Sequence, residues 1–331
     1  MFPQGHAFPD LPPRDEIAIC FAHVAYPLAE SFARRATGLT HFQVWNQDDL
    51  RRRLGDAQVL VVSGLWHNDL LDGAPGLRLI QSIGAGYEQF PLDLLRARGI
   101  RLANAKGVNR NAVSEHAMAL ILSLARQLHT GRDHQRAHYW RGMISDLNCR
   151  EDELGGKTLL IVGLGGIGSR LAALARAFDM QVIATKRTPA TAPSAAHEVH
   201  PPEQLAALLP RADFVALTCP LTAETRNLID ASALARMKPS AYLINVARGG
   251  CVDELALLAA LQSGAIAGAG LDHFWDEPLP PDSPFWELEN VVITPHTAGE
   301  TRRYEENLLD ILLENLARLW RGEAELVNQV V

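Results

Sequence analysis

The chain has 331 residues, 47% of them hydrophobic and 21% charged, with a formal net charge of -7. This is the composition of a globular protein, and the length predicts two domains, because one hydrophobic core rarely serves so many residues. The acidic balance and the shortness of the basic clusters argue against a nucleic acid as partner.

The sequence also predicts a cytoplasmic protein that is not embedded in a membrane. No run approaches the roughly 18 apolar residues of a membrane span. The opening residues, 1–16, lack the basic start and apolar centre of a signal peptide. Four cysteines without paired or metal-type spacing predict free thiols, a reducing compartment and no metal site: Cys20, Cys149, Cys219 and Cys251.

Short β-rich runs alternate with amphipathic helical runs along the chain, which is typical of parallel α/β sheets. In the first third, helices are expected at 27–37 and 91–98. The strands expected there form a complete small open sheet by themselves, at residues 16–21, 41–45, 57–63, 77–82 and 100–103.

A long helical pattern at 111–129 predicts a connecting helix. The polar stretch that follows, 131–153, carries Trp140, Met143 and Ile144 as isolated apolar points. Two interpretations stay open for it: an arm that packs on another subunit, or a surface loop.

A second α/β series begins near residue 158, and its strands are expected at 158–162, 181–185, 213–219, 241–246, 265–271 and 291–294. The last helix, 301–321, is expected to return to the first domain. The sequence therefore predicts one domain made of residues 1–107 and 300–331, and a second made of residues 108–299.

The strand at 158–162 runs directly into a glycine turn and then into a helix. In this context the G-x-G-x-x-G pattern predicts a dinucleotide site. Gly163 permits the tight turn, Gly165 lets backbone approach a pyrophosphate, and Gly168 allows close contact between helix and strand. Gly166 and Ile167 complete the turn at the helix N-terminus, whose amides favour the diphosphate.

The next strand ends without the carboxylate that holds the ribose 2′-hydroxyl of NAD. Lys186, Arg187 and Thr188 stand there instead. Two cations and a hydroxyl would attract a 2′-phosphate, so the sequence predicts NADP in preference to NAD, with NAD still possible. The alternative is that both cations point into solvent.

Three further segments offer the groups that reduce a 2-oxo acid by hydride transfer: a cation for the carboxylate, an acid for the forming alkoxide, and a partner that keeps the acid charged. Arg248 follows a strand and can bind a carboxylate bidentately. His296 follows another strand and is the best acid–base candidate, because imidazole as a group titrates near neutrality. Glu277 would accept a hydrogen bond from His296 and favour the imidazolium, with Asp276 as the rival.

Each of these residues also has an ordinary interpretation. An arginine more often pairs with a surface carboxylate, and a loop carboxylate is more often solvated. The other histidines are expected mostly at the surface. His134 and His138 stand four apart on an expected helix, but without a further ligand they do not predict a metal site.

The motifs in this order resemble the D-isomer-specific 2-hydroxyacid dehydrogenase family over nearly the whole chain. They are Gln81-Ser-Ile-Gly84-Ala-Gly86, Ala112-Val-Ser-Glu115-His116-Ala, the glycine turn, Cys219-Pro-Leu-Thr222-Ala-Glu-Thr225, Asn245-Val-Ala-Arg248-Gly-Gly, Gly270-Leu-Asp272 with Glu277-Pro-Leu-Pro, and Thr294-Pro-His296.

The resemblance implies a flavodoxin-like substrate domain, a Rossmann-like doubly wound nucleotide-binding domain, and a homodimer. It implies that Arg248 binds the substrate carboxylate with the amides of Ala85 and Gly86, that His296 donates the proton and that Glu277 is its partner. Asp272 would face the nicotinamide carboxamide. The remaining residues expected to line the cofactor are Cys219, Pro220, Thr225, Val246, Ala247 and Ala298, together with Arg248 and His296.

Two other functions share this scaffold and these residues. One is a dinucleotide-sensing corepressor, although the chain lacks the long disordered tails expected of such a protein. The other is phosphite oxidation. Reduction of a small 2-oxo acid to the D-2-hydroxy acid, and the reverse reaction, is the leading hypothesis.

Overall fold

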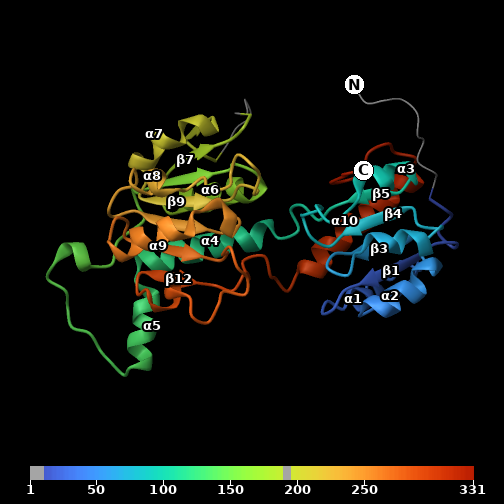
Figure 1. Cartoon of the computed structure of the whole chain (residues 1–331), viewed down its shortest axis with the longest axis horizontal. Helices are drawn as coiled ribbons and strands as arrows, with labels where there is room; N and C mark the ends of the chain where they lie inside the picture. The colour runs from blue at the N-terminus through green and yellow to red at the C-terminus, as the bar shows by residue number, and fades with distance from the viewer. Residues whose placement is uncertain (1–10, 189–194) are drawn as a thin grey trace. The chain divides into compact units, whose positions relative to one another are not determined.

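The computed structural model describes residues 11–188 and 195–331. The opening residues, whose composition argued against a signal peptide, lie partly outside this range. The chain divides into two compact units (Figure 1): the first unit is Met1–Asn109 with Thr301–Val331, and the second unit is Arg110–Glu300. None of the helices in the described part has the length and apolar character needed to cross a bilayer.

The first unit holds a parallel sheet with the strand order β2-β1-β3-β4-β5. This is the flavodoxin-like order of a doubly wound sheet. Its central strand is buried along its whole length, as the β-branched run predicts. The strands are β1 (Ala18–Ala22), β2 (Thr40–Val44), β3 (Val59–Val62), β4 (Leu79–Ser82) and β5 (Arg101–Ala103).

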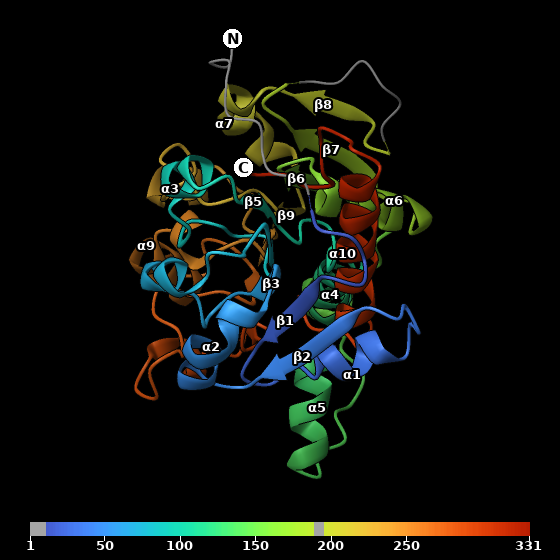
Figure 2. The same ribbon diagram turned by 90° about the vertical axis from the view of Figure 1, so that its right-hand side faces the viewer.

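The helices of the first unit are α1 (Leu28–Ala33), α2 (Gln47–Arg53), α3 (Leu92–Ala97) and α10 (Tyr304–Trp320). The last of these, the long red helix of Figure 2, belongs to this unit although it follows the second unit in sequence. Its leucines recur with helical spacing, so one face enters the core that also contains strand residues of β1. The fully buried leucines are Leu308, Leu309, Leu312 and Leu316.

The second unit holds a parallel sheet with the order β12-β11-β10-β9-β6-β7-β8. The order reverses at β6, which is the Rossmann-like, doubly wound arrangement. The strands are β6 (Thr158–Val162), β7 (Gln181–Thr185), β8 (Glu198–His200), β9 (Phe214–Leu217), β10 (Tyr242–Asn245), β11 (Gly268–Leu271) and β12 (Val291–Ile293).

Sequence analysis missed β8, a three-residue edge strand that is only half-buried. Its hydrogen bonds to β7 decide its conformation, and it has no apolar pattern of its own.

The helices of the second unit are α4 (Arg110–Ala125), α5 (Leu128–Arg136), α6 (Gly166–Ala177), α7 (Leu205–Leu208), α8 (Ala231–Leu234) and α9 (Glu254–Gln262). The prediction of one helix over 111–129 is wrong, because Gln127 adopts a left-handed conformation (φ 49°) and separates α4 from α5. Helix α4 packs closely on β11, where a Cβ at Gly270 would lie 3.0 Å from that of Leu120. Helix α5, by contrast, buries no residue.

The segment that follows α5, residues 137–149, runs out from the rest of the second unit and is drawn in green in Figure 1. It exposes four large hydrophobic side chains: Tyr139 is 58% exposed, Trp140 96%, Met143 103% and Leu147 75%. Such a group of exposed apolar side chains is unusual for a surface loop.

Candidate active site

The glycine turn between β6 and α6 has the geometry that its sequence predicts. Gly163 has a φ of 104°, and a Cβ there would lie 2.8 Å from the Cα of Cys219. A Cβ at Gly168 would lie 2.5 Å from the carbonyl oxygen of Gly163, so the turn and the helix can meet only without side chains. Gly165 has no atom within 4 Å of its Cβ position. Its backbone is therefore open to a ligand, at the end of a helix with no acidic residue in its first turn.

The residues predicted to read the ribose lie next to this turn. The N–H groups of Gly163 and Leu164 both donate to the carbonyl of Thr185, the last residue of β7. Lys186 and Arg187 follow at once, and Arg187 is exposed. Among residues 11–188 and 195–331, neither cation makes an ion pair with a carboxylate within 4.0 Å, so both remain able to meet an anionic ligand.

The segment after β9 lies on the other side of the glycine turn. The hydroxyl of Thr218 donates to the carbonyl of Gly163 over 2.8 Å, and buried Cys219 is the residue that Gly163 approaches. The hydroxyl of Thr225 donates to the carbonyl of Pro220 over 2.7 Å, which closes the segment into a compact turn.

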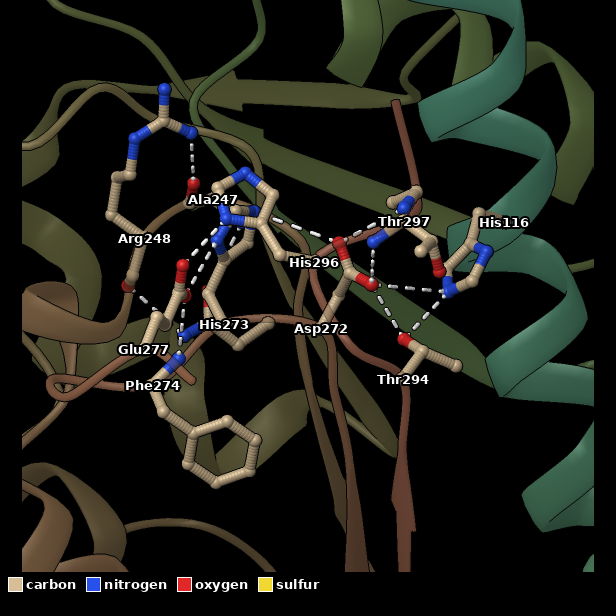
Figure 3. Close-up of polar contacts among 12 residues, drawn as sticks. His116, Ala247, Arg248, Asp272, His273, Phe274, Glu277, Thr294, His296 and Thr297 are labelled. Carbon is tan, nitrogen blue, oxygen red and sulfur yellow. Dashed lines mark hydrogen bonds and ion pairs between the residues drawn. The ribbon is translucent and has the colours of Figure 1, made fainter. Parts of the chain in front are cut away.

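The residues predicted for chemistry all lie past the carboxyl ends of three neighbouring strands, β10, β11 and β12 (Figure 3). Parallel strands bring these ends to one edge of the sheet, where ligands bind in such folds. After β10, Val246 and Ala247 are buried and Arg248 is exposed, with its guanidinium donating to the carbonyl of Ala247 over 2.7 Å. The next residue, Gly249, packs so closely on Phe274 that a Cβ would lie 2.0 Å from its backbone.

Asp272, directly after β11, is 1% exposed and organises the loop after β12. It accepts hydrogen bonds from the backbone N–H groups of Thr297 and Ala298 over 2.9 and 3.0 Å. The hydroxyl of Thr294 donates to it over 2.6 Å and accepts in turn from Nε2 of His116, 2.9 Å away. Most of the acceptor capacity of this carboxylate is therefore used within the protein.

This loop holds His296 in place. His296 has a φ of 53°, unusual for a residue with a side chain, and its N–H donates to the carbonyls of Asp272 and Thr294. Its Nδ1 lies 2.6 Å from Oε2 of Glu277. Because an ionised carboxylate can only accept, the proton between them belongs to Nδ1, and half of the imidazole remains exposed.

Glu277 is held from its other oxygen by the backbone N–H of Phe274, over 3.1 Å. Partial burial raises the pKa of the Glu277 carboxyl, but the hydrogen bonds from His296 and Phe274 outweigh that effect and leave the pKa below its usual value. Glu277 is therefore an anion at neutral pH. Asp276, the rival candidate, makes no hydrogen bond with His296 among the described residues.

The structure reveals a further histidine that the sequence analysis assigned to no role. The general expectation that histidines outside the site lie at the surface is wrong for His273, which is 5% exposed. Its ring meets that of His296 edge-on, with the ring centres 4.0 Å apart. Burial lowers the pKa of His273 to about 4, and the positive charges of His296 and Arg248 act in the same direction. Its position in the sequence, between the two predicted site residues Asp272 and Glu277, is the signal that could have identified it as a site residue.

Figure 3 shows the two predicted catalytic side chains, His296 and Arg248, close to one another beside His273. Both of them act to lower the pKa of His273. The other histidine pair is not preserved as a pair on one helix. His134 lies in α5 and its ring meets that of Tyr139 edge-on, whereas His138 lies beyond the end of that helix.

Ala85 and Gly86 lie in the first unit, in the loop after β4. Their carbonyls are held by Asn104 and by Ser82, over 2.8 and 3.3 Å. Neither of their N–H groups donates to another atom of the described residues. Both amides are therefore available to a ligand.

Comparison with known proteins identifies the family. Residues 118–298 match the family described as D-isomer specific 2-hydroxyacid dehydrogenase, NAD binding domain. The chain belongs to the D-isomer specific 2-hydroxyacid dehydrogenase family. It is 39% identical over 285 residues to glyoxylate/hydroxypyruvate reductase B of Yersinia pestis, a match that covers 84% of this chain and 85% of the relative.

Solved structures of the family share the whole architecture. A D-isomer specific 2-hydroxyacid dehydrogenase family protein from Aeromonas salmonicida has a TM-score of 0.82 at 30% identity, over 96% of this chain and 99% of that chain. An NADPH-dependent glyoxylate/hydroxypyruvate reductase from Sinorhizobium meliloti, in complex with NADP and sulfate, has a TM-score of 0.79 at 27% identity, over 95% and 98%. The chain is an oxidoreductase with the NAD-binding domain of this family, and the predicted fold class and family are confirmed.

Proposed function

We propose that this oxidoreductase reduces a small 2-oxo acid, glyoxylate or hydroxypyruvate, to the D-2-hydroxy acid with NADPH, and catalyses the reverse reaction. The observation that carries the proposal is the contact of 2.6 Å between His296 and Glu277, beside Arg248 at the ligand-binding edge of the sheet. The names of the relatives from Yersinia pestis and Sinorhizobium meliloti support this substrate class.

The residues of the chain supply charge and a proton, and the dinucleotide, when bound, supplies the hydride. Glu277 holds one proton on Nδ1 of His296, so the protonated imidazole presents its second N–H, at Nε2, to the carbonyl oxygen of the substrate. As negative charge develops on this oxygen, the Nε2 proton transfers to it and the imidazole becomes neutral. In the reverse direction the neutral imidazole accepts the proton.

Arg248 is proposed to bind the substrate carboxylate through its guanidinium. This residue is exposed, and among the described residues its guanidinium donates a hydrogen bond only to the carbonyl of Ala247. The free amides of Ala85 and Gly86 would bind the same carboxylate. The first unit is then the substrate domain and the second unit the dinucleotide-binding domain.

The second unit fits a dinucleotide. The open backbone at Gly165 and the N-terminus of α6 suit the pyrophosphate, and Lys186, Arg187 and Thr188 suit a 2′-phosphate, which favours NADP. The other residues proposed to line this site lie in the glycine turn or in the segments that follow β9, β10, β11 and β12: Gly163, Gly166, Ile167, Gly168, Cys219, Pro220, Thr225, Val246, Ala247, Asp272 and Ala298.

A substrate panel tests the proposal. Oxidation of NADPH and of NADH would be followed with glyoxylate, hydroxypyruvate, pyruvate, and branched and aromatic 2-oxo acids, and reduction of NADP and NAD with phosphite. We expect the highest kcat/KM for glyoxylate or hydroxypyruvate with NADPH. Turnover of phosphite alone, or tight dinucleotide binding without any turnover, would contradict the proposal and indicate phosphite oxidation or a sensor.

We also propose that the chain forms a homodimer through residues 137–149. The exposed side chains of Trp140, Met143 and Leu147 form the surface that a second copy would cover, next to a shallow pocket lined by residues of α5 and this segment. Light scattering coupled to gel filtration should give a dimer for the natural chain and a monomer for Trp140→Asp/Met143→Asp. A monomeric natural chain at micromolar concentration would contradict the dimer.

A further inference from the structure

Three side chains with metal-binding chemistry converge past the ends of β11 and β12: His273, Glu277 and His296 (Figure 3). One ligand atom of each lies within 4.8 Å of the others. Oε2 of Glu277 lies 2.6 Å from Nδ1 of His296, and Oε1 lies 3.3 Å from Nδ1 of His273. Within residues 11–188 and 195–331, this is the only group of three or more such side chains gathered so closely.

The environment of His273 points independently to a ligand. Its side chain is 4% exposed, and Nδ1 is a buried atom with no hydrogen-bond partner among the described residues. This nitrogen faces Oε1 of Glu277 over 3.3 Å without the geometry of a hydrogen bond. A buried nitrogen in this position loses its hydration without compensation, unless a cation is bound between it and the carboxylate.

Two imidazoles and one carboxylate form the His₂Glu ligand set that suits Zn²⁺. Bond lengths of about 2.0–2.2 Å in a tetrahedron place the ligand atoms roughly 3.3 Å apart. Nδ1 of His273 already lies 3.3 Å from Oε1 of Glu277. Nδ1 of His296 lies only 2.6 Å from Oε2 of Glu277, so this distance must increase when the metal binds. His296 is half exposed, so its side chain can rotate to lengthen this contact, and water would take the fourth position.

We propose that His273, Glu277 and His296 form a binding site for Zn²⁺ and similar divalent transition metals, and that the bound metal inhibits the enzyme. The metal would replace the proton that Glu277 holds on Nδ1 of His296. An imidazole with a metal on Nδ1 cannot act as the charged acid of the reaction, so proton donation stops. Removal of the metal restores the pair.

The neighbouring charges indicate a reversible site rather than a permanent one. The guanidinium of Arg248 acts on the same cluster and disfavours a second cation. The anionic Glu277 and the buried Asp272, whose Oδ2 lies 3.7 Å from Nε2 of His273, oppose that effect. Because the three ligands come from one short segment and one loop, both within the second unit, the site does not require the first unit.

Co²⁺ is the probe for the test, because its visible d–d absorption reports tetrahedral coordination. Full-length protein treated with a chelator would be titrated with Co²⁺, and Zn²⁺ affinity would be measured by displacement of the Co²⁺ signal. We expect saturable absorption at one equivalent and its loss on addition of Zn²⁺. Failure to develop this absorption below millimolar Co²⁺ would overturn the proposal.

Two variants and one control locate the site. His273→Leu and Glu277→Gln should each weaken Zn²⁺ binding at least about tenfold, the lower end of what even a lost supporting hydrogen bond costs a metal site. His200→Leu is the matched control, because His200 pairs with Glu198 over 2.9 Å without a third ligand. It should leave the affinity unchanged. Unchanged binding in His273→Leu or Glu277→Gln, with circular dichroism showing a folded protein, would overturn the proposal.

An activity measurement completes the test. Zn²⁺ should inhibit the natural chain, a chelator should reverse the inhibition, and His273→Leu should resist it at the same concentration. Inhibition that persists in His273→Leu would overturn the inhibitory role. The Co²⁺ signal needs no substrate, so a failure of the proposed 2-oxo acid reduction would leave the binding test intact and would be recognised separately.

Discussion

The two units have the same architecture but bury different polar groups. In the first unit the buried polar side chains are neutral, and Asn315 holds backbone: it donates to the carbonyl of Val327 over 3.2 Å and accepts from the N–H of the same residue over 2.7 Å. In the second unit an acid and a base, Asp272 and His273, are buried at the end of one strand. They are the only acidic or basic side chains that are buried among the described residues.

This difference shows which part of the molecule contains buried groups that destabilise the fold but can serve catalysis. A buried neutral amide with its hydrogen bonds satisfied stabilises the fold at little expense. A buried ionisable group is costly, and such groups gather at functional sites. The catalytic chemistry of this chain is therefore expected to depend on the second unit.

The largest effect is expected for a substitution that tests whether the second unit holds the catalytic acid. His296→Ala should lower kcat by about 10³-fold, within the usual range for loss of a general acid. Fluorescence titration should show that NADPH binding is retained. His67→Ala, which changes an exposed histidine of the first unit, should leave kcat unchanged. A nearly normal kcat in His296→Ala would remove this residue from the mechanism.

Arg248 should show the next largest effect. Arg248→Ala is expected to lower kcat/KM by about 10–100-fold and to raise KM, because a hydrogen bond to a charged group contributes about 1.5–3 kcal/mol. Arg248→Lys should recover part of this loss, since it keeps the charge but not the planar fork. Arg236→Ala, at an exposed position of the same unit, is the control. Equal KM values in all three variants would contradict carboxylate binding by Arg248.

The buried base predicts how stability changes with pH. The pKa of His273 is about 4 in the folded chain and about 6.5 in the unfolded chain, so between these values only the unfolded chain binds the proton. The contribution of neutral His273 to the free energy of unfolding is therefore fully present above pH 6.5, and it is lost as the pH falls toward 4. Between pH 7.5 and 5 the loss is about 2 kcal/mol, because one pKa unit corresponds to about 1.4 kcal/mol.

Thermal unfolding with a chelator present measures this dependence. His273→Leu should show a smaller decrease in Tm between the two pH values than the natural chain does. The same decrease in both proteins would show that another group causes the pH dependence.

The smallest effect concerns the cofactor. Lys186→Ser/Arg187→Ser should raise KM for NADPH by roughly tenfold, as expected for the loss of charge-assisted contacts to one phosphate, and should leave KM for NADH unchanged. NADH serves as the internal control. A rise in both KM values would indicate that the two cations contribute to the site in general and do not select the 2′-phosphate.

Much of the fold and of the site could be predicted because the signals are local. A glycine turn needs only its own residues and the strand and helix beside it, and buried strands of a parallel sheet are short apolar runs. The positions of Arg248, Asp272 and His296 directly after such runs predicted that they would share one edge of the sheet. Predictions failed where the neighbours decide the conformation, at β8 and at the break between α4 and α5.

The sequence by itself determined two α/β domains, the dinucleotide turn, the family, and the candidate acid, its partner and the cation. Only the tertiary structure decided that His273 is buried, that its Nδ1 faces Glu277 without a hydrogen bond, and that Asp272 holds the loop of His296. Burial and charge at these positions depend on side chains that come from different strands. A linear pattern specifies which groups are present, and only packing determines how much water and which charges surround them.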